Sequence, residues 1–152
     1  MRVSYFAYGS NMNPDKLRNR GVFFYSMRPA TLQGYRLVFN KQSSKFPTVG
    51  FANVIEDENS NVEGIIYEIN DNDIQNLDYF EGFPLNYRRE ILKVESFGGW
   101  EEDAIVYIAQ PEKVKEGLRI TEKYFSNFMN ARKYLTKEYF NKLMKIYNEN
   151  QR

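Results

Sequence analysis

The sequence predicts an α+β domain built on a mostly antiparallel sheet or small barrel. Segments with the alternation and the β-branched or aromatic content of strands fill most of residues 3–109. Helical spacing of apolar residues dominates from Thr121 onward. Strands first and helices clustered late are typical of α+β proteins. The 152-residue chain shows no internal repeat and no flexible linker, so we expect one domain over residues 1–152.

Six segments have strand character. The segment 3–8 is aromatic and stops at Gly9, and the segment 62–69 alternates with Ile65, Tyr67 and Ile69 on one face. The Gly98-Gly99 pair is a turn that would join the last two strands. The polar stretch 41–49 is expected to be a loop. The predicted strands are 3–8, 31–40, 51–56, 62–69, 87–95 and 104–109.

Four helices are predicted between and after these strands. The first begins at Asn13-Pro14, because Asn caps helices and Pro suits the first helical position. A short helix over 71–80 has an apolar stripe of Ile74, Leu77 and Phe80, and Gly82 is placed to end it. The last two helices begin near Thr121 and Thr136. They would form a helical C-terminal tail.

The chain contains no Cys and no His. A thiol nucleophile, a Ser-His-Asp triad and a disulfide are therefore excluded, and zinc sites, which normally use Cys and His, are not expected. Proton transfer near neutral pH would have to use Glu, Asp, Lys or Tyr. We expect neither a metal ion nor a cofactor.

The charge balance gives no sign of a polyanionic partner. The chain has 21 basic and 20 acidic residues, for a net charge of +1. We therefore expect neither nucleic acid nor a membrane as a partner. The N-terminus lacks the pattern of a secretory signal, and no apolar run is long enough to span a bilayer, so the expected location is the cytoplasm.

The first candidate site is the loop Gly9-Ser10-Asn11 between the first strand and the first helix. Gly permits close approach of a ligand, and the first turn of a helix leaves backbone N–H groups unpaired. Such a loop favours a carboxylate or a developing oxyanion. The same residue types are also common in ordinary turns between a strand and a helix, so a ligand-binding loop and a simple turn both remain open.

The second candidate site is Glu81, directly before Gly82. A carboxylate at the negative end of a helix, desolvated by Tyr79, Phe80 and Phe83, should have a raised pKa. A general base needs this property where His is absent. The alternative is that Glu81 faces water like most carboxylates. The remaining charged residues are expected to be solvated, with loops at 57–58 and 101–103 and surface cations at Lys41, Lys45, Arg88 and Arg89.

Three segments together resemble the γ-glutamylcyclotransferase-like family. Residues 5–12, Tyr-Phe-Ala-Tyr-Gly-Ser-Asn-Met, are similar to its N-terminal Tyr-Gly-Ser-Asn signature. Residues 62–67 and 77–82 are similar to its Gly-Val-Val-Trp/Tyr strand and its Leu-Asp-x-x-Glu-Gly motif. The similarity extends through Tyr87 to Tyr124. It is less exact there, because Ile120-Thr121-Glu122-Lys123 stands where the family often has Pro-Ser.

The resemblance implies a small mixed β-barrel with short helices packed outside. It also implies conversion of a γ-glutamyl amide to 5-oxoproline and a free amine, without metal or cofactor. Glu81 occupies the position of the family's catalytic Glu. The substrate-binding residues that the resemblance implies are Tyr5, Phe6, Ala7, Tyr8, Gly9, Ser10, Asn11, Tyr87 and Tyr124.

Several alternatives remain at this point. The substrate could be a γ-glutamyl amino acid, γ-glutamyl-ε-lysine, glutathione or a γ-glutamylated biosynthetic intermediate, with the amine selected by loops 41–50 and 83–87. A non-catalytic domain of the same fold, which binds a small carboxylate or a protein, is the main competing function. The chain could be a monomer or a homodimer, because the amphipathic tail 136–149 could cover the barrel or a second subunit.

Overall fold

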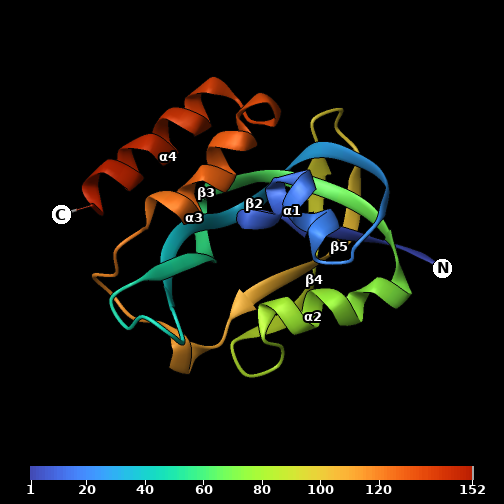
Figure 1. The fold of residues 1–152 in the computed structure, drawn as a ribbon. Coiled ribbons are helices and arrows are strands. Elements are labelled where there is room, and N and C mark those ends of the chain that lie inside the picture. Colours follow the sequence, from blue (N-terminus) through green and yellow to red (C-terminus); the bar gives the residue numbers. More distant parts are fainter. Residues whose placement is uncertain (152) are drawn as a thin grey trace.

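Five strands close into a barrel in the computed structural model, which describes residues 1–151 (Figure 1). The strand order is β1-β3-β2-β4-β5, and all neighbours are antiparallel except β1 and β5, which pair in parallel at Tyr5 and Ile105. The strands are β1 (Arg2–Ala7), β2 (Phe24–Gln42), β3 (Gly50–Asn70), β4 (Tyr87–Ser96) and β5 (Glu101–Ala109). The prediction of a small, mixed and mostly antiparallel barrel is confirmed.

Strands β2 and β3 are longer than the sequence predicted. They have 19 and 21 residues and form one long hairpin, so the predicted strands 51–56 and 62–69 are parts of a single strand. The register shifts near Gly34, whose φ of +81° suits glycine, and this irregularity lets the polar segment 57–60 stay within β3. The solvated loop expected at 57–58 is therefore wrong.

The acidic segment 101–103 also belongs to a strand, β5, and not to a loop. Glu102 accepts a hydrogen bond from the Ser4 hydroxyl and pairs with Arg28 across the barrel wall. The contacts with Ser4 and Arg28 hold the Glu102 carboxylate against the sheet. The acidic composition of the segment does not indicate these contacts.

The middle of β3, from Val62 to Tyr67, is buried on both faces. Two side chains of its odd-numbered face contact helical segments. Glu63 accepts hydrogen bonds from Thr136, and the Tyr67 hydroxyl donates to the carbonyl of Asn11. The even-numbered side chains are left for the barrel interior. This strand therefore joins the barrel core to its helical cover.

Four α-helices lie outside the barrel within the described residues: α1 (Pro14–Asn19), α2 (Ile74–Glu81), α3 (Glu122–Asn130) and α4 (Lys137–Glu149). The predicted cap at Asn13 and the predicted helix starts near Thr121 and Thr136 are confirmed. The side chains of Asn13, Thr121 and Thr136 accept hydrogen bonds from backbone N–H groups at the starts of α1, α3 and α4. Helices α3 and α4 pack together on one side of the barrel, where the rings of Phe125 and Tyr147 stack with their centroids 4.2 Å apart (Figure 1).

Helix α2 lies away from this pair and ends at Gly82, as predicted, in a left-handed conformation (Figure 1). It starts at Ile74 after a 3₁₀ turn over Asp71–Asp73, so the expected helix 71–80 is shorter at its N-terminal end. Leu77 is buried but Phe80 is 48% exposed, so Phe80 does not belong to the core stripe. Within residues 1–151, no helix combines the length and the apolar character needed to cross a membrane.

Candidate active site

A cavity of about 500 Å³ brings both candidate sites together. Its walls come from the end of β1, the loop that follows it, the C-terminal end of α2, the start of β4 and helix α3. The predicted site residues that line it are Tyr5, Phe6, Tyr8, Gly9, Ser10, Asn11, Glu81, Tyr87 and Tyr124. Ala7 does not line the cavity, because its methyl group is buried in the barrel core.

Glu81 is the last residue of α2, and a network at the same helix end fixes its position. One helical turn earlier, Asp78 accepts a hydrogen bond from the Tyr107 hydroxyl at 2.7 Å and lies 3.4 Å from the Arg89 guanidinium. These contacts tie the end of α2 to β5 and β4. After the helix, Asn86 donates its N–H to the carbonyl of Gly82, which tightens the turn into β4.

Burial raises the pKa of Glu81 from 4.5 to about 7, while Arg20 and Lys41 act in the opposite direction. Tyr79 and Phe80, two of the predicted sources of this desolvation, are 79% and 48% exposed, although both line the same cavity as Glu81. No described residue donates a hydrogen bond to the carboxylate, so its oxygens are available to a ligand.

Buried tyrosines surround this carboxylate. Burial is the main cause that raises the pKa values of Tyr5, Tyr8 and Tyr87, and the charge of Glu81 raises all three further. The Tyr8 hydroxyl donates to the carbonyl of Tyr107, and the Tyr87 hydroxyl donates to the carbonyl of Ala52 at 2.8 Å. These phenols are neutral and fixed, so they shape the cavity.

Tyr124 differs from Tyr8 and Tyr87, because its hydroxyl accepts a hydrogen bond. The donor is the N–H of Ala52 at 2.9 Å, and the phenolic proton has no acceptor among the described residues. A Cβ atom on Gly9 would lie 3.4 Å from this hydroxyl and 3.4 Å from Cβ of Ala52. The loop, Tyr124 and Ala52 therefore meet closely, and the phenolic proton can be donated to a ligand.

The loop after β1 forms a 3₁₀ turn, η1 (Ser10–Met12). The N–H groups of Ser10 and Asn11 donate to no described residue, as the sequence suggested. The Asn11 side chain, in contrast, is fully used, because it donates to the Tyr5 hydroxyl at 2.9 Å and accepts from Arg20 at 2.7 Å. Asn11 therefore supports its neighbours, and the free donors of the loop are its backbone amides.

Comparison with known proteins shows the family of this chain. Residues 5–127 match the family described as "Gamma-glutamyl cyclotransferase, AIG2-like". The chain belongs to this family. A bovine γ-glutamylcyclotransferase is 35% identical over 83 residues, which cover 51% of this chain and 43% of the bovine protein.

Solved structures of similar proteins share the fold. A γ-glutamyl cyclotransferase is 24% identical with a TM-score of 0.83, over 95% of this chain and 87% of that one. YkqA from Bacillus subtilis is 26% identical with a TM-score of 0.86, over 99% of this chain and 56% of YkqA. The match thus spans about half the length of YkqA and less than half of the bovine relative.

In this member of the cyclotransferase family, the cavity contains four cations that the sequence reasoning did not place there: Lys16, Arg20, Lys41 and Lys45. Lys41 was expected at the surface but is only 4% exposed. Regular alternation does not account for this burial, because the register shifts between Val38 and Lys41 and three consecutive residues, Phe39, Asn40 and Lys41, are buried. No sequence pattern indicated Arg20 either.

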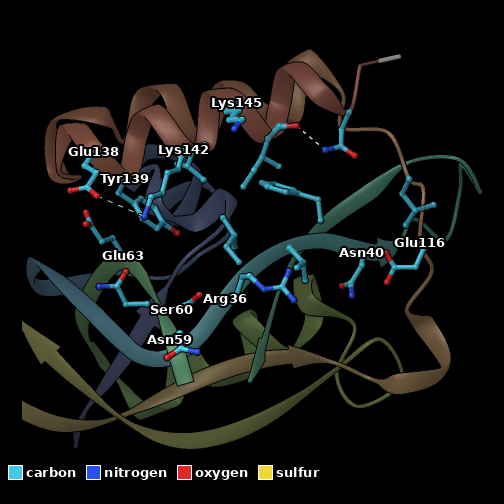
Figure 2. Close-up of a pocket in the computed structure, with 18 of the residues that line it drawn as sticks. Arg36, Asn40, Asn59, Ser60, Glu63, Glu116, Glu138, Tyr139, Lys142 and Lys145 are labelled. Atoms are coloured by element: carbon cyan, nitrogen blue, oxygen red, sulfur yellow. Dashed lines mark hydrogen bonds and ion pairs between the residues drawn. The ribbon is translucent and has the colours of Figure 1, made fainter. Parts of the chain in front are cut away.

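Within residues 1–151, no group of three or more His, Cys, Asp or Glu side chains is arranged to hold a metal ion. A second cavity, of about 870 Å³, lies between α4 and the β2–β3 hairpin (Figure 2). None of the predicted site residues lines it. Its buried carboxylate, Glu63, accepts two hydrogen bonds from Thr136, and Glu138 pairs with Lys142. Glu63 and Glu138 therefore have partners within the protein, unlike Glu81.

Proposed function

We propose that this chain converts a γ-glutamyl amide to 5-oxoproline and a free amine, with Glu81 as general acid and base. The observation that carries the proposal is the Glu81 carboxylate. It has no hydrogen-bond donor among the described residues, burial raises its pKa to about 7, and it shares a cavity with the Gly9-Ser10-Asn11 loop. The same activity is named for the bovine relative. Family membership and the cavity both support the proposal.

Glu81 has the proton affinity that the reaction needs. The α-amine of the substrate is an ammonium at neutral pH and cannot attack until it loses a proton. The Glu81 carboxylate accepts this proton, and the amine then attacks the γ-carbonyl carbon. A C–N bond forms to close the ring, which leaves one surplus proton on the ring nitrogen. The amide C–N bond then breaks, and the leaving amine takes up this proton and the proton held by Glu81, so that it departs as an ammonium. Atoms and charges balance without an added reactant.

The loop and Tyr124 supply the remaining contributions. The free N–H groups of Ser10 and Asn11 and the phenolic proton of Tyr124 are donors for the glutamyl carboxylate or for the developing oxyanion. The reacting groups belong to one molecule, so holding the glutamyl chain in a folded conformation removes much of the entropic barrier. The aromatic walls of the cavity favour such a compact conformation by excluding water.

The test is Glu81→Gln with γ-glutamyl-alanine as substrate and 5-oxoproline as the measured product. We expect kcat to fall about 10²–10⁴-fold, the usual contribution of general acid–base catalysis. In the wild type, kcat/KM should rise with pH through about 7, because the carboxylate form is the active one. Circular dichroism of the variant controls for folding.

A Glu81→Gln variant with wild-type turnover would exclude Glu81 as the base. If the wild type turned over no γ-glutamyl compound but bound 5-oxoproline in a thermal-shift assay, the non-catalytic alternative would replace the enzymatic one. Both results are obtained from the same protein preparations.

A further inference from the structure

Lys41 is a buried cation without a partner. It is 4% exposed, and among the described residues its ammonium has no carboxylate within 4 Å and no hydrogen-bond acceptor. It lies between two rings, 6.0 Å from the centroid of Phe51 and 5.8 Å from that of Tyr87. Burial lowers the pKa of Lys41, with Lys113 as a further cause, whereas Glu81 acts to raise it. A buried ammonium held in this way is unfavourable unless an anion pairs with it.

The ammonium faces the cavity that contains Glu81. A second cation, Arg20, lines a different wall. Its guanidinium donates to Asn11 and Ser10 and lies 5.2 Å from the centroid of Phe80. Arg20 thus supports the loop that would hold the glutamyl unit, whereas Lys41, at the end of β2, lies on another wall with Phe51 of β3 and Tyr87 of β4. With Lys16, Lys45 and Glu81 included, the lining has a formal charge of +3 when Glu81 is ionised.

We propose that Lys41 determines substrate specificity by binding a carboxylate on the leaving amine. The inference rests on the proposed cyclisation of γ-glutamyl amides. The glutamyl carboxylate lies at the loop beside Arg20, and the second carboxylate of the substrate pairs with Lys41. The chemical class selected is a γ-glutamyl amide whose amine carries a carboxylate. Neutral amines lose this pairing, and cationic amines are repelled.

The test compares two substrates that differ only by this carboxylate. Removing the carboxylate from γ-glutamyl-alanine gives γ-glutamyl-ethylamide, so the ratio of their kcat/KM values isolates its contribution. We expect the wild type to prefer γ-glutamyl-alanine about tenfold to hundredfold, the usual effect of a charged hydrogen bond. Lys41→Met should reduce this preference to about one. Because Lys41 also lowers the pKa of Glu81, the readout is the ratio of the two kcat/KM values and not the turnover of either substrate alone. Turnover of the ethylamide shows that the variant is folded.

Lys115→Met is the matched control, because Lys115 is exposed and lies outside the catalytic cavity. It removes one positive charge and should keep the wild-type preference. Equal losses for both substrates in Lys41→Met, or no preference in the wild type, would overturn the assignment of Lys41 while leaving the cyclisation intact. A wild type that turned over neither substrate would overturn the inference together with the proposed function.

Discussion

The raised pKa of Glu81 predicts a stability change with a definite pH dependence. A carboxylic acid that titrates at about 7 when folded and at 4.5 when unfolded keeps its proton longer in the folded state. As the pH rises from 4.5 to 7, the unfolded state therefore ionises first, and the folded protein loses about 3 kcal/mol of stability. This contribution is unfavourable above pH 7 and absent well below pH 4.5. Glu81→Gln removes it.

We therefore expect Glu81→Gln to be stabilised relative to wild type at high pH. The free energy of unfolding of the variant minus that of wild type should increase by about 2.5 kcal/mol between pH 5 and pH 8. For a domain of this size, this corresponds to a relative rise in Tm of about 5–10 °C. Urea denaturation at the two pH values measures the difference directly. Glu112→Gln, which removes an exposed carboxylate, controls for the lost charge. If the difference between Glu81→Gln and wild type were the same at both pH values, burial would not raise the pKa of Glu81.

Two further predictions concern how the barrel holds this carboxylate. Asp78→Asn weakens the contacts of α2 with Tyr107 and Arg89. It should lower the free energy of unfolding by about 1–2 kcal/mol and reduce kcat more than it changes KM. Wild-type values of kcat and KM for this variant would contradict a positioning role. In Gly64→Ala, the added Cβ would lie 2.3 Å from the carbonyl oxygen of Ala7 and 2.8 Å from the Phe6 ring. It should cost about 1–3 kcal/mol by thermal or urea denaturation, whereas Gly98→Ala, whose nearest contact would be 3.6 Å, should be close to neutral.

The fold could largely be predicted because its signals are local. Alternation located the strands, and Asn13, Thr121, Thr136 and Gly82 marked helix ends that the structure confirms. The extent of β2 and β3 could not be predicted in this way. The polar segment 57–60 has no partner in β2 and forms a bulge opposite Gly34, between the paired residues Glu56 and Asn61, so its place in β3 depends on where pairing with β2 resumes.

The site residues were likewise predictable only where the sequence signal is local. The loop and Glu81 occur in recognisable motifs, and the structure places both at one cavity. Arg20 and Lys41 belong to no recognisable motif. Their place in the cavity depends on how two segments far apart in the sequence, the residue after α1 and the end of β2, lie in space.

The arrangement of charges in the cavity argues for a particular kind of ligand. Arg20, Lys41 and Glu81 are close enough to influence one another, since both cations lower the pKa of Glu81. Yet among the described residues no ion pair joins Glu81 to either cation, although pairing would relieve the cost of burying Lys41. A fold selected for stability alone would neutralise these groups internally. Under the proposed function, the ammonium of a γ-glutamyl amino acid complements Glu81 and its two carboxylates complement Arg20 and Lys41, three of the five charged residues that line the cavity. The unpaired charges are thus best explained as the protein's half of a set of ion pairs that the substrate completes.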